Sequence, residues 1–200
     1  MAIEAVLVHT HLDLQRGKAR VDALRSAAYA ALERCARRAG ARLGLLEHDP
    51  RGAPRPQAGW FWSVSHTSQG GSGWVAAVLA RAPVGIDLEH VRPRREELVE
   101  RVLDAREREL VGIGARGFAS AWTAKEAVLK KLGVGLTELS LCRIVGRTRA
   151  GLSLALSGNL HAVEQIDFDR TVCSVSADAA DARVRWTCDM GTGTSLEECA

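Results

Sequence analysis

The stretch Gly85-Ile86-Asp87-Leu88-Glu89 places two carboxylates two residues apart in an apolar run. Side chains with this spacing leave the same face of a β-strand, so a strand here presents Asp87 and Glu89 together. Gly85 has no side chain and lets another backbone or a ligand come close to the strand. The stretch therefore predicts a strand with one acidic face.

The segment WTAKEAVLK, residues 122–130, adds a third carboxylate and a lysine. Apolar residues recur every three or four positions over residues 118–132, which predicts a helix. Glu126 and Lys130 are four apart and share one face of it. Lys125 falls near the middle of the apolar stripe, where a lysine is either stretched along apolar surface or drawn inward by an acid or a phosphate.

These two motifs together indicate a magnesium site that handles phosphates. Mg²⁺ prefers carboxylate and phosphate oxygens, and Asp87, Glu89 and Glu126 supply three carboxylates with Lys130 beside them. Each motif alone has a plainer interpretation. The first is then a solvent-facing acidic strand end, and the second an ion pair between neighbouring helical turns.

A third motif lies upstream, in the segment WFWSVSHT at residues 60–67. The three blocks, in this order, resemble the 4'-phosphopantetheinyl transferases of the surfactin-synthetase-activating type. Their pattern is a Ser-His pair, then Gly-Ile-Asp-hydrophobic-Glu, then Trp-x-x-Lys-Glu-Ala with a lysine four residues after the glutamate. The resemblance covers residues 60–130, and any one block alone would be weak.

The resemblance implies that the chain moves 4'-phosphopantetheine from coenzyme A to a serine of an apo acyl or peptidyl carrier protein. The reaction depends on Mg²⁺ and releases 3',5'-ADP. Glu126, directly or through a metal-bound water, is then the base, and Lys130 and His66 stabilise the leaving group. The implied residues are Asp87, Glu89 and Glu126 for the metal; Glu126, Lys130 and Asp87 for catalysis; and Ser65, His66, Lys125 and Lys130 for coenzyme A.

One position departs from the family pattern. Where the family has Gly-Lys-Pro or Gly-Arg-Pro before the Ser-His strand, this chain has Gly52-Ala53-Pro54. The basic residue that touches the nucleotide end of coenzyme A is missing there. Three arginines could supply a charge near the coenzyme from other positions: Arg51, Arg55 and, for the 3'-phosphate, Arg20.

The pattern along the chain predicts an α+β fold. Strands are expected at 3–8, 60–65, 74–79, 84–88, 152–156, 163–168, 172–175 and 184–187, and helices at 21–39, 93–109 and 118–132. The resemblance implies two pseudo-symmetric halves, each a helix packed on a small and mainly antiparallel sheet, with coenzyme A between them. We expect an N-terminal half at 1–90, a C-terminal half at 91–190 and a mobile tail at 191–200.

Composition is that of a soluble globular protein, with 46% apolar and 26% charged residues. The start of the chain lacks the basic and apolar regions of a secretory signal, which predicts a cytoplasmic protein. Its five cysteines are odd in number and form no Cys-x-x-Cys pair, which argues against a disulfide framework and a zinc site. We expect a monomer that binds neither membrane nor nucleic acid, since a net charge of +3 is small.

Basic residues crowd the first quarter of the chain. Such a field would attract coenzyme A and a carrier protein, which are both anionic. The plainer interpretation is that these side chains solvate the outer face of a helix. The residues are Arg16, Lys18, Arg20, Arg25, Arg34, Arg37, Arg38 and Arg42.

Two other functions fit the same residues. One is a Mg²⁺-dependent phosphodiesterase or nuclease built on the acidic cluster. The other is a non-catalytic module that binds coenzyme A or a carrier protein, against which the complete set of Asp87, Glu89, Glu126 and Lys130 argues. Covalent catalysis by Ser65 is disfavoured, because no acid is evident that would orient His66.

Overall fold

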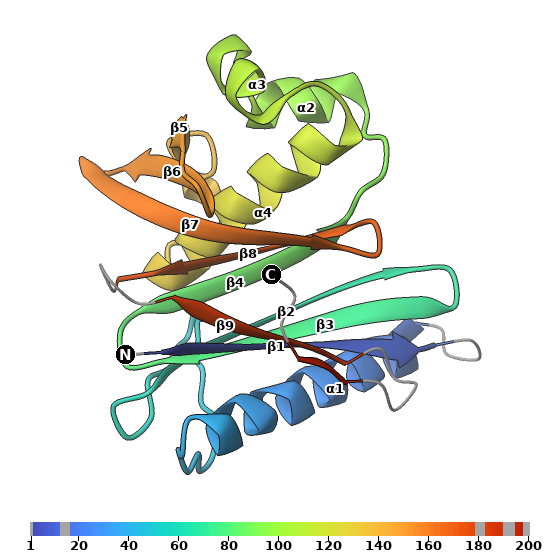
Figure 1. Cartoon of the computed structure of the whole chain (residues 1–200), viewed down its shortest axis with the longest axis vertical. Helices are drawn as coiled ribbons and strands as arrows, with labels where there is room; N and C mark the ends of the chain where they lie inside the picture. Colours follow the sequence, from blue (N-terminus) through green and yellow to red (C-terminus); the bar gives the residue numbers. More distant parts are fainter. Residues whose placement is uncertain (1, 13–16, 179–182, 190–194, 198–200) are drawn as a thin grey trace.

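The structure is a computed structural model that describes residues 2–12, 17–178, 183–189 and 195–197. These residues form strands, four α-helices and one short 3₁₀ turn, in an order that starts with a strand and a long helix (Figure 1). The elements are β1 Ile3–His11, α1 Gly17–Arg38, β2 Phe61–Gln69, β3 Ser72–Ala80, β4 Val84–His90, α2 Glu96–Val102, α3 Ala105–Val111, α4 Ala115–Leu132, the 3₁₀ turn Leu136–Glu138, β5 Arg143–Arg147, β6 Gly151–Leu156, β7 Asn159–Phe168, β8 Thr171–Ala177, β9 Val184–Asp189 and β10 Ser195–Glu197.

The strands form two five-stranded sheets within the described residues. The first sheet has the order β10-β9-β1-β3-β2, and the second has the order β4-β8-β7-β6-β5. Neighbouring strands are antiparallel except for the parallel pair β1–β9. The α+β fold with mainly antiparallel sheets is thereby confirmed.

Three apolar cores hold the chain in four layers. In Figure 1, α1 lies against the first sheet, the two sheets lie against each other, and α4 covers the second sheet. Strand β3 shows why the pattern of its sequence does not alternate. Trp74, Ala76 and Val78 face the second sheet, whereas Val75 and Ala77 face α1, so both faces of the strand are buried.

The two sheets do not follow the division of the chain at residue 90. Strand β4 is the edge of the second sheet, and β9, from the far end of the chain, pairs with β1 in the first. The expected mobile tail also differs in part, because residues 195–197 pair with Thr187–Asp189 as β10. The rest of residues 191–200 lies outside the described residues.

The single helix expected over residues 93–109 is two helices, α2 and α3. Asp104 begins α3 with a capping box: its carboxylate accepts from the Glu107 backbone N–H, and the Glu107 side chain accepts from the Asp104 N–H. This box turns the chain between the two helices. Strand β5 was not predicted, because only Ile144 of its five residues is buried.

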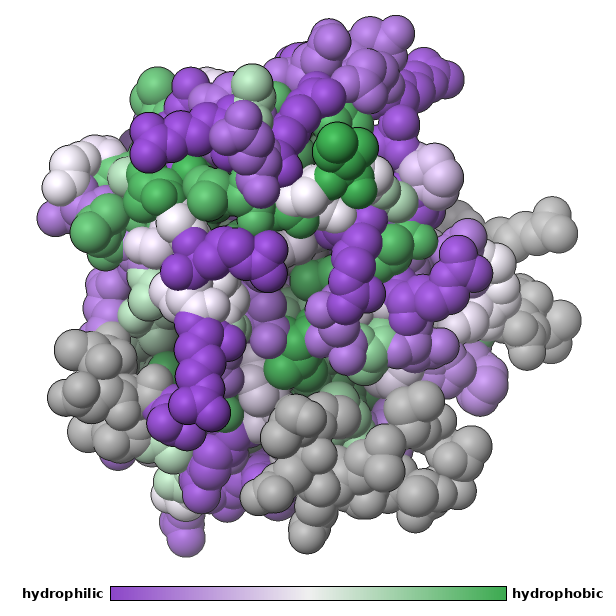
Figure 2. Space-filling model, turned by 45° about the horizontal axis from the view of Figure 1, so that its top comes forward, coloured by the Kyte–Doolittle hydropathy of each residue, from purple (hydrophilic) through white to green (hydrophobic). Residues whose placement is uncertain are grey.

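Apolar side chains reach the surface mainly on the second sheet and its helices. Figure 2 shows them in the upper half of the view, where Figure 1 has α2–α4 and the second sheet, with charged side chains between them. Ile113, Leu136, Leu141, Val145 and Leu160 are each more than 40% exposed. No helix in the described part of the chain is long and apolar enough to cross a membrane.

Three of the cysteines, Cys35, Cys142 and Cys173, are buried free thiols, and Cys188 is buried as well. Burial raises the pKa of Cys35 to about 12 and that of Cys142 to about 11, so neither is a thiolate at neutral pH. Cys199 lies outside the described residues.

Gly85 brings β4 against the backbone of α4. A Cβ atom at this position would lie 2.1 Å from the Ala127 carbonyl oxygen and 2.5 Å from the Lys131 nitrogen. No side chain fits in this space. The sequence predicted that a backbone or a ligand comes close to Gly85, and the structure shows that it is the backbone of α4. The glycine therefore sets the distance between the strand that carries Asp87 and the helix that carries Glu126.

Gly85→Ala should lower the melting temperature by roughly 3–10 °C, because overpacking costs about 1–3 kcal/mol and each kcal/mol is worth about 2–4 °C in a protein of this size. Gly146→Ala is the matched control, since a Cβ there meets no atom within 4 Å. Thermal unfolding followed by circular dichroism compares the two. Equal melting temperatures for both variants would show that β4 and α4 are not in tight contact.

Candidate active site

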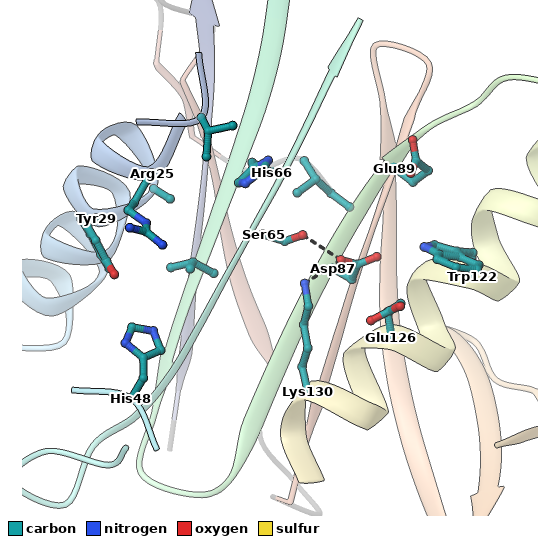
Figure 3. A pocket seen from close by; sticks show the side chains of 14 residues that line it. Arg25, Tyr29, His48, Ser65, His66, Asp87, Glu89, Trp122, Glu126 and Lys130 are labelled. Atoms are coloured by element: carbon teal, nitrogen blue, oxygen red, sulfur yellow. Dashed lines mark hydrogen bonds and ion pairs between the residues drawn. The ribbon is translucent and has the colours of Figure 1, made fainter. Parts of the chain in front are cut away.

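A cavity of about 460 Å³ lies where α1, β2, β4 and α4 meet. Figure 3 shows the polar side chains that point into it from these elements. Strand β4 contributes Asp87 and Glu89, and α4 contributes Glu126 and Lys130. The two sequence motifs thus face one space, as their spacing predicts.

Side chains bond the edge of one sheet to the edge of the other. Ser65 Oγ donates to Asp87 Oδ1 at 2.7 Å, and Thr67 Oγ1 donates to Glu89 Oε1 at 3.2 Å. The Ile86 N–H donates to Ser63 Oγ at 3.3 Å. Alternate residues of β2 therefore fix the positions of the carboxylates on β4.

Asp87 is the most enclosed of the three carboxylates, with 7% of its surface exposed. Lys130 Nζ lies 2.7 Å from the same Oδ1 that Ser65 contacts, and also donates to the Ile86 carbonyl at 3.2 Å. The lysine thus bonds to β4 rather than to Glu126 one turn earlier on its own helix. The plain ion pair between Glu126 and Lys130 is not formed.

Glu126 shares the cavity with Asp87 and accepts no hydrogen bond from the described residues. Burial, followed by the negative charge of Asp87, raises the pKa of Glu126 to about 7, while Lys130 acts in the opposite direction. A carboxylate in this position gains from any cation that approaches it and Asp87 together.

Glu89 also faces the cavity, but its oxygens have partners. Oε1 accepts from Thr67 and from the His90 backbone N–H at 3.1 Å, and Oε2 lies 3.0 Å from Arg94 Nη2. Arg92 Nη2 is 3.6 Å from Oε1. A metal ion would have to compete with two arginines for this carboxylate.

The fit of a magnesium ion follows from these contacts. No three His, Cys, Asp or Glu side chains among the described residues lie close enough together to enclose an ion. Asp87 and Glu126 do fit one, because they are two hard oxygen donors in one cavity whose charges repel each other. Mg²⁺ is often bound by one or two carboxylates together with water and substrate phosphates.

Ser65 and His66 both line the cavity, on opposite faces of β2. Ser65 is bonded to Asp87, so its hydroxyl positions a carboxylate. Burial, followed by the positive charge of Lys130, lowers the pKa of His66. The imidazole is therefore neutral at neutral pH and offers one ring N–H to a ligand.

Three residues outside the motifs also line this cavity with polar side chains: Arg25 and Tyr29 of α1 and His48 of the following loop. Trp122, the first residue of the motif on α4, lines it as well. Arg25 and Tyr29 are four apart on a predicted helix, so their shared face could have been noticed. His48 lies in an irregular loop, and no pattern marks it.

The four remaining basic residues predicted to bind coenzyme A are placed differently. Lys125 is fully buried and bonded to Glu107 and to the Val102 carbonyl, so it cannot touch a ligand in the cavity. The sequence left two alternatives for Lys125, and the structure shows the second: an acid, Glu107, draws the lysine inward. Arg20 donates to the Gly70 carbonyl and Arg55 lies 3.9 Å from Glu47, and neither lines the cavity.

Arg51 lines a second, smaller cavity of about 300 Å³. Both cavities are lined by His48, Val64, Glu126 and Lys130, and the second one is completed by Ser63, Leu129 and residues 52–54 and 133–136. Most of these additional residues are apolar or glycine. Glu126 and Lys130 thus stand between a polar space and a more apolar one.

Comparison with known proteins agrees with this geometry. A family model described as ACPS, 4'-phosphopantetheinyl transferase superfamily, matches residues 83–174. The search of curated proteins found no match. The matched segment runs from β4 into β8 and contains Asp87, Glu89, Glu126 and Lys130. Residues 83–174 are thus similar to the 4'-phosphopantetheinyl transferase superfamily.

Proposed function

We propose that this chain transfers 4'-phosphopantetheine from coenzyme A to a serine of an apo acyl or peptidyl carrier protein and releases 3',5'-ADP. The observation that carries the proposal is the convergence of Asp87, Glu126 and Lys130 on one cavity inside the matched segment. The surfactin-synthetase-activating subtype is part of the proposal. It is supported by Ser65 and His66, which lie outside that segment and line the same cavity.

Coenzyme A fits the two cavities in one orientation. Its phosphates are anionic, and the larger cavity offers Arg25, His66 and Lys130. Its pantetheine arm is uncharged and extended, and suits the smaller, more apolar cavity beyond Lys130. The pyrophosphate would then lie beside Lys130 and Glu126, where the two spaces meet. In this orientation the loop at Ala53 faces the pantetheine arm, and Arg25 supplies a positive charge at the phosphates from α1 instead.

Asp87 and Glu126 would hold Mg²⁺, and Glu89 would join them only by releasing Arg94. When bound, the ion neutralises negative charge on the phosphates of coenzyme A. Lys130 is already beside Asp87, so it lies where the leaving phosphate gains charge. Ser65 keeps Asp87 oriented toward both.

The attacking serine hydroxyl must lose a proton, and Glu126 is placed to accept it. Its carboxylate accepts no hydrogen bond from the described residues, so one oxygen can hold the ion while the other takes the proton. The proton leaves the serine oxygen as that oxygen bonds to phosphorus. The bond from phosphorus to the 3',5'-ADP oxygen breaks, and Lys130 stabilises the charge on that oxygen.

The arrangement of the chain supports three further parts of the proposal. Both sheets line the cavity, so a monomer completes the site. Each five-stranded sheet of the described residues carries one long helix, which fits a pseudo-twofold relation between the two layers of helix and sheet. Buried free thiols fit a reducing, cytoplasmic environment.

Mass spectrometry of a panel of apo carrier proteins, incubated with the protein, coenzyme A and Mg²⁺, tests the function. We expect one carrier to gain one phosphopantetheine for each 3',5'-ADP released. Asp87→Asn should lower the rate at least about 100-fold, whereas Asp178→Asn, whose aspartate pairs with the next lysine of α4, should not. Release of 3',5'-ADP without carrier mass gain would indicate a phosphodiesterase instead.

Lys130→Met should lower kcat by about tenfold or more and change the coenzyme A dissociation constant less, because the cation matters most as charge builds on the leaving phosphate. Lys131→Met is the control on the same helix, since that lysine bonds to His161 and Asp178 outside the cavity. Steady-state kinetics and calorimetry give both quantities. A loss of affinity with unchanged kcat would assign Lys130 to binding alone.

Glu126→Gln should stabilise the metal-free protein above pH 7 while removing its activity. The pKa of Glu126 is raised in the folded state, so the stability it contributes is present below its unfolded value and is lost as the pH rises through about 7. Glutamine carries no charge at pH 5 or at pH 8, so the variant lacks this pH dependence. The melting temperature of the variant, relative to wild type in EDTA, should therefore be higher at pH 8 than at pH 5.

Glu109→Gln on the exposed face of α3 is the control for this measurement, and its effect should not depend on pH over this range. If the difference for Glu126→Gln were equally independent of pH, burial and Asp87 would not oppose the charge of this carboxylate in the folded protein.

A further inference from the structure

Lys125, the residue before Glu126 on α4, does not reach the cavity but contacts other elements of the fold. Lys125 is fully buried on the side of α4 that faces away from the cavity. Its Nζ lies 2.7 Å from Glu107 Oε1 and donates to the Val102 carbonyl at 2.6 Å. The ammonium therefore binds the end of α2 and the start of α3.

Glu107 gathers further elements at the same point. It is 1% exposed, and its carboxylate accepts from the Asp104 N–H at 3.0 Å and from the Ile144 N–H at 2.8 Å. These partners belong to the cap of α3 and to β5. The ion pair with Lys125 thus joins α2, α3, α4 and β5 in the interior.

A buried ion pair is a weak source of stability, because removing two charges from water costs about as much as their attraction returns. What such a pair does supply is direction, since its hydrogen bonds are satisfied in one arrangement and an apolar contact tolerates sliding. On α4, successive residues point about 100° apart. Fixing the direction of Lys125 also fixes the direction of Glu126.

The other polar and close contacts of α4 lie on one side of the helix and do not fix its rotation alone. Gly85 sets the distance to β4, and Thr123 Oγ1 lies 2.6 Å from Ser174 Oγ on β8. Both are on the sheet side of the helix. The Lys125–Glu107 pair holds the side turned toward α2 and α3, and with it the rotation of the helix is fixed.

We propose that Lys125 and Glu107 are positioning residues, which hold α4 in the rotation that brings the Glu126 carboxylate to Asp87. This inference rests on the proposed function for its catalytic consequence, but not for its effect on metal binding. Catalytic groups must be held within about 0.5 Å of their working positions. A small rotation of α4 is therefore enough to separate the two carboxylates.

The test is a double variant, Lys125→Met with Glu107→Gln, which replaces the ion pair by neutral side chains of similar length. We expect it to fold, to bind Mn²⁺ at least about fivefold more weakly and to lose about tenfold or more in kcat, with the KM for coenzyme A within about threefold. Calorimetric titration with MnCl₂ and steady-state kinetics give these values. Wild-type Mn²⁺ affinity and kcat in the double variant would overturn the proposal.

Glu4→Gln is the matched control, because Glu4 is equally buried and paired with Arg38, but on β1. It should lower the melting temperature and leave Mn²⁺ affinity and kcat unchanged. If the double variant does not fold, Glu107→Gln alone, which retains Lys125, is measured in the same way with the same two outcomes. Wild-type protein that binds Mn²⁺ but transfers nothing would contradict the proposed function only. The Mn²⁺ affinity of the double variant, compared with that of wild type, then decides the positioning role. Wild-type protein that binds no Mn²⁺ would contradict this inference as well.

Discussion

The contact of Asp87 with Ser65 and Lys130 is the interaction on which the site depends. It joins β2 at the edge of the first sheet, β4 at the edge of the second, and α4. Two sheet edges normally meet through backbone hydrogen bonds or are kept apart. Here serine and threonine hydroxyls of β2 bond to carboxylates of β4 instead, which leaves those carboxylates beside the cavity that α1 and α4 complete. The cavity is a consequence of how the two sheets are joined.

Helix α4 has to hold a carboxylate in a position that the carboxylate itself disfavours. Burial and Asp87 both oppose the charge of Glu126, as its raised pKa reflects. Such a group stays in place only if the surrounding structure fixes the backbone. Gly85 fixes the distance between strand and helix, and the Lys125–Glu107 pair fixes the side away from the sheet. The free energy that this position costs is offset by the apolar contacts of the helix with the second sheet, where Phe118, Val128 and Leu129 are buried.

Sequence patterns predicted the elements whose periodicity is simple. Helices α1 and α4 follow their apolar stripes, and β4 follows the alternation that places Asp87 and Glu89 on one face. Strand β5 was not predicted, because a single buried residue gives no alternating pattern. The placement of β4 in the second sheet and of β9 in the first depends on long-range strand pairing, which no local pattern encodes. In the site, Lys125 was predicted to bind coenzyme A because it belongs to the same motif as Glu126 and Lys130. The capping-box spacing of Asp104 and Glu107 predicts the start of α3, whereas the pairing of Glu107 with Lys125 is a tertiary contact. The arginines at Glu89 and the loop residue His48 are tertiary contacts, and only the structure brings them to the site.

Crystals of the protein grown with coenzyme A and soaked in MnCl₂ provide the most direct measurement. The anomalous difference map locates the metal, and the ordinary map locates the pyrophosphate. The account predicts one manganese peak bonded to carboxylate oxygens of both Asp87 and Glu126, with the pyrophosphate beside Lys130 and the adenine end toward Arg25 and His66. A peak bonded to neither carboxylate, or coenzyme A bound outside the space between β2, β4 and α4, would contradict it.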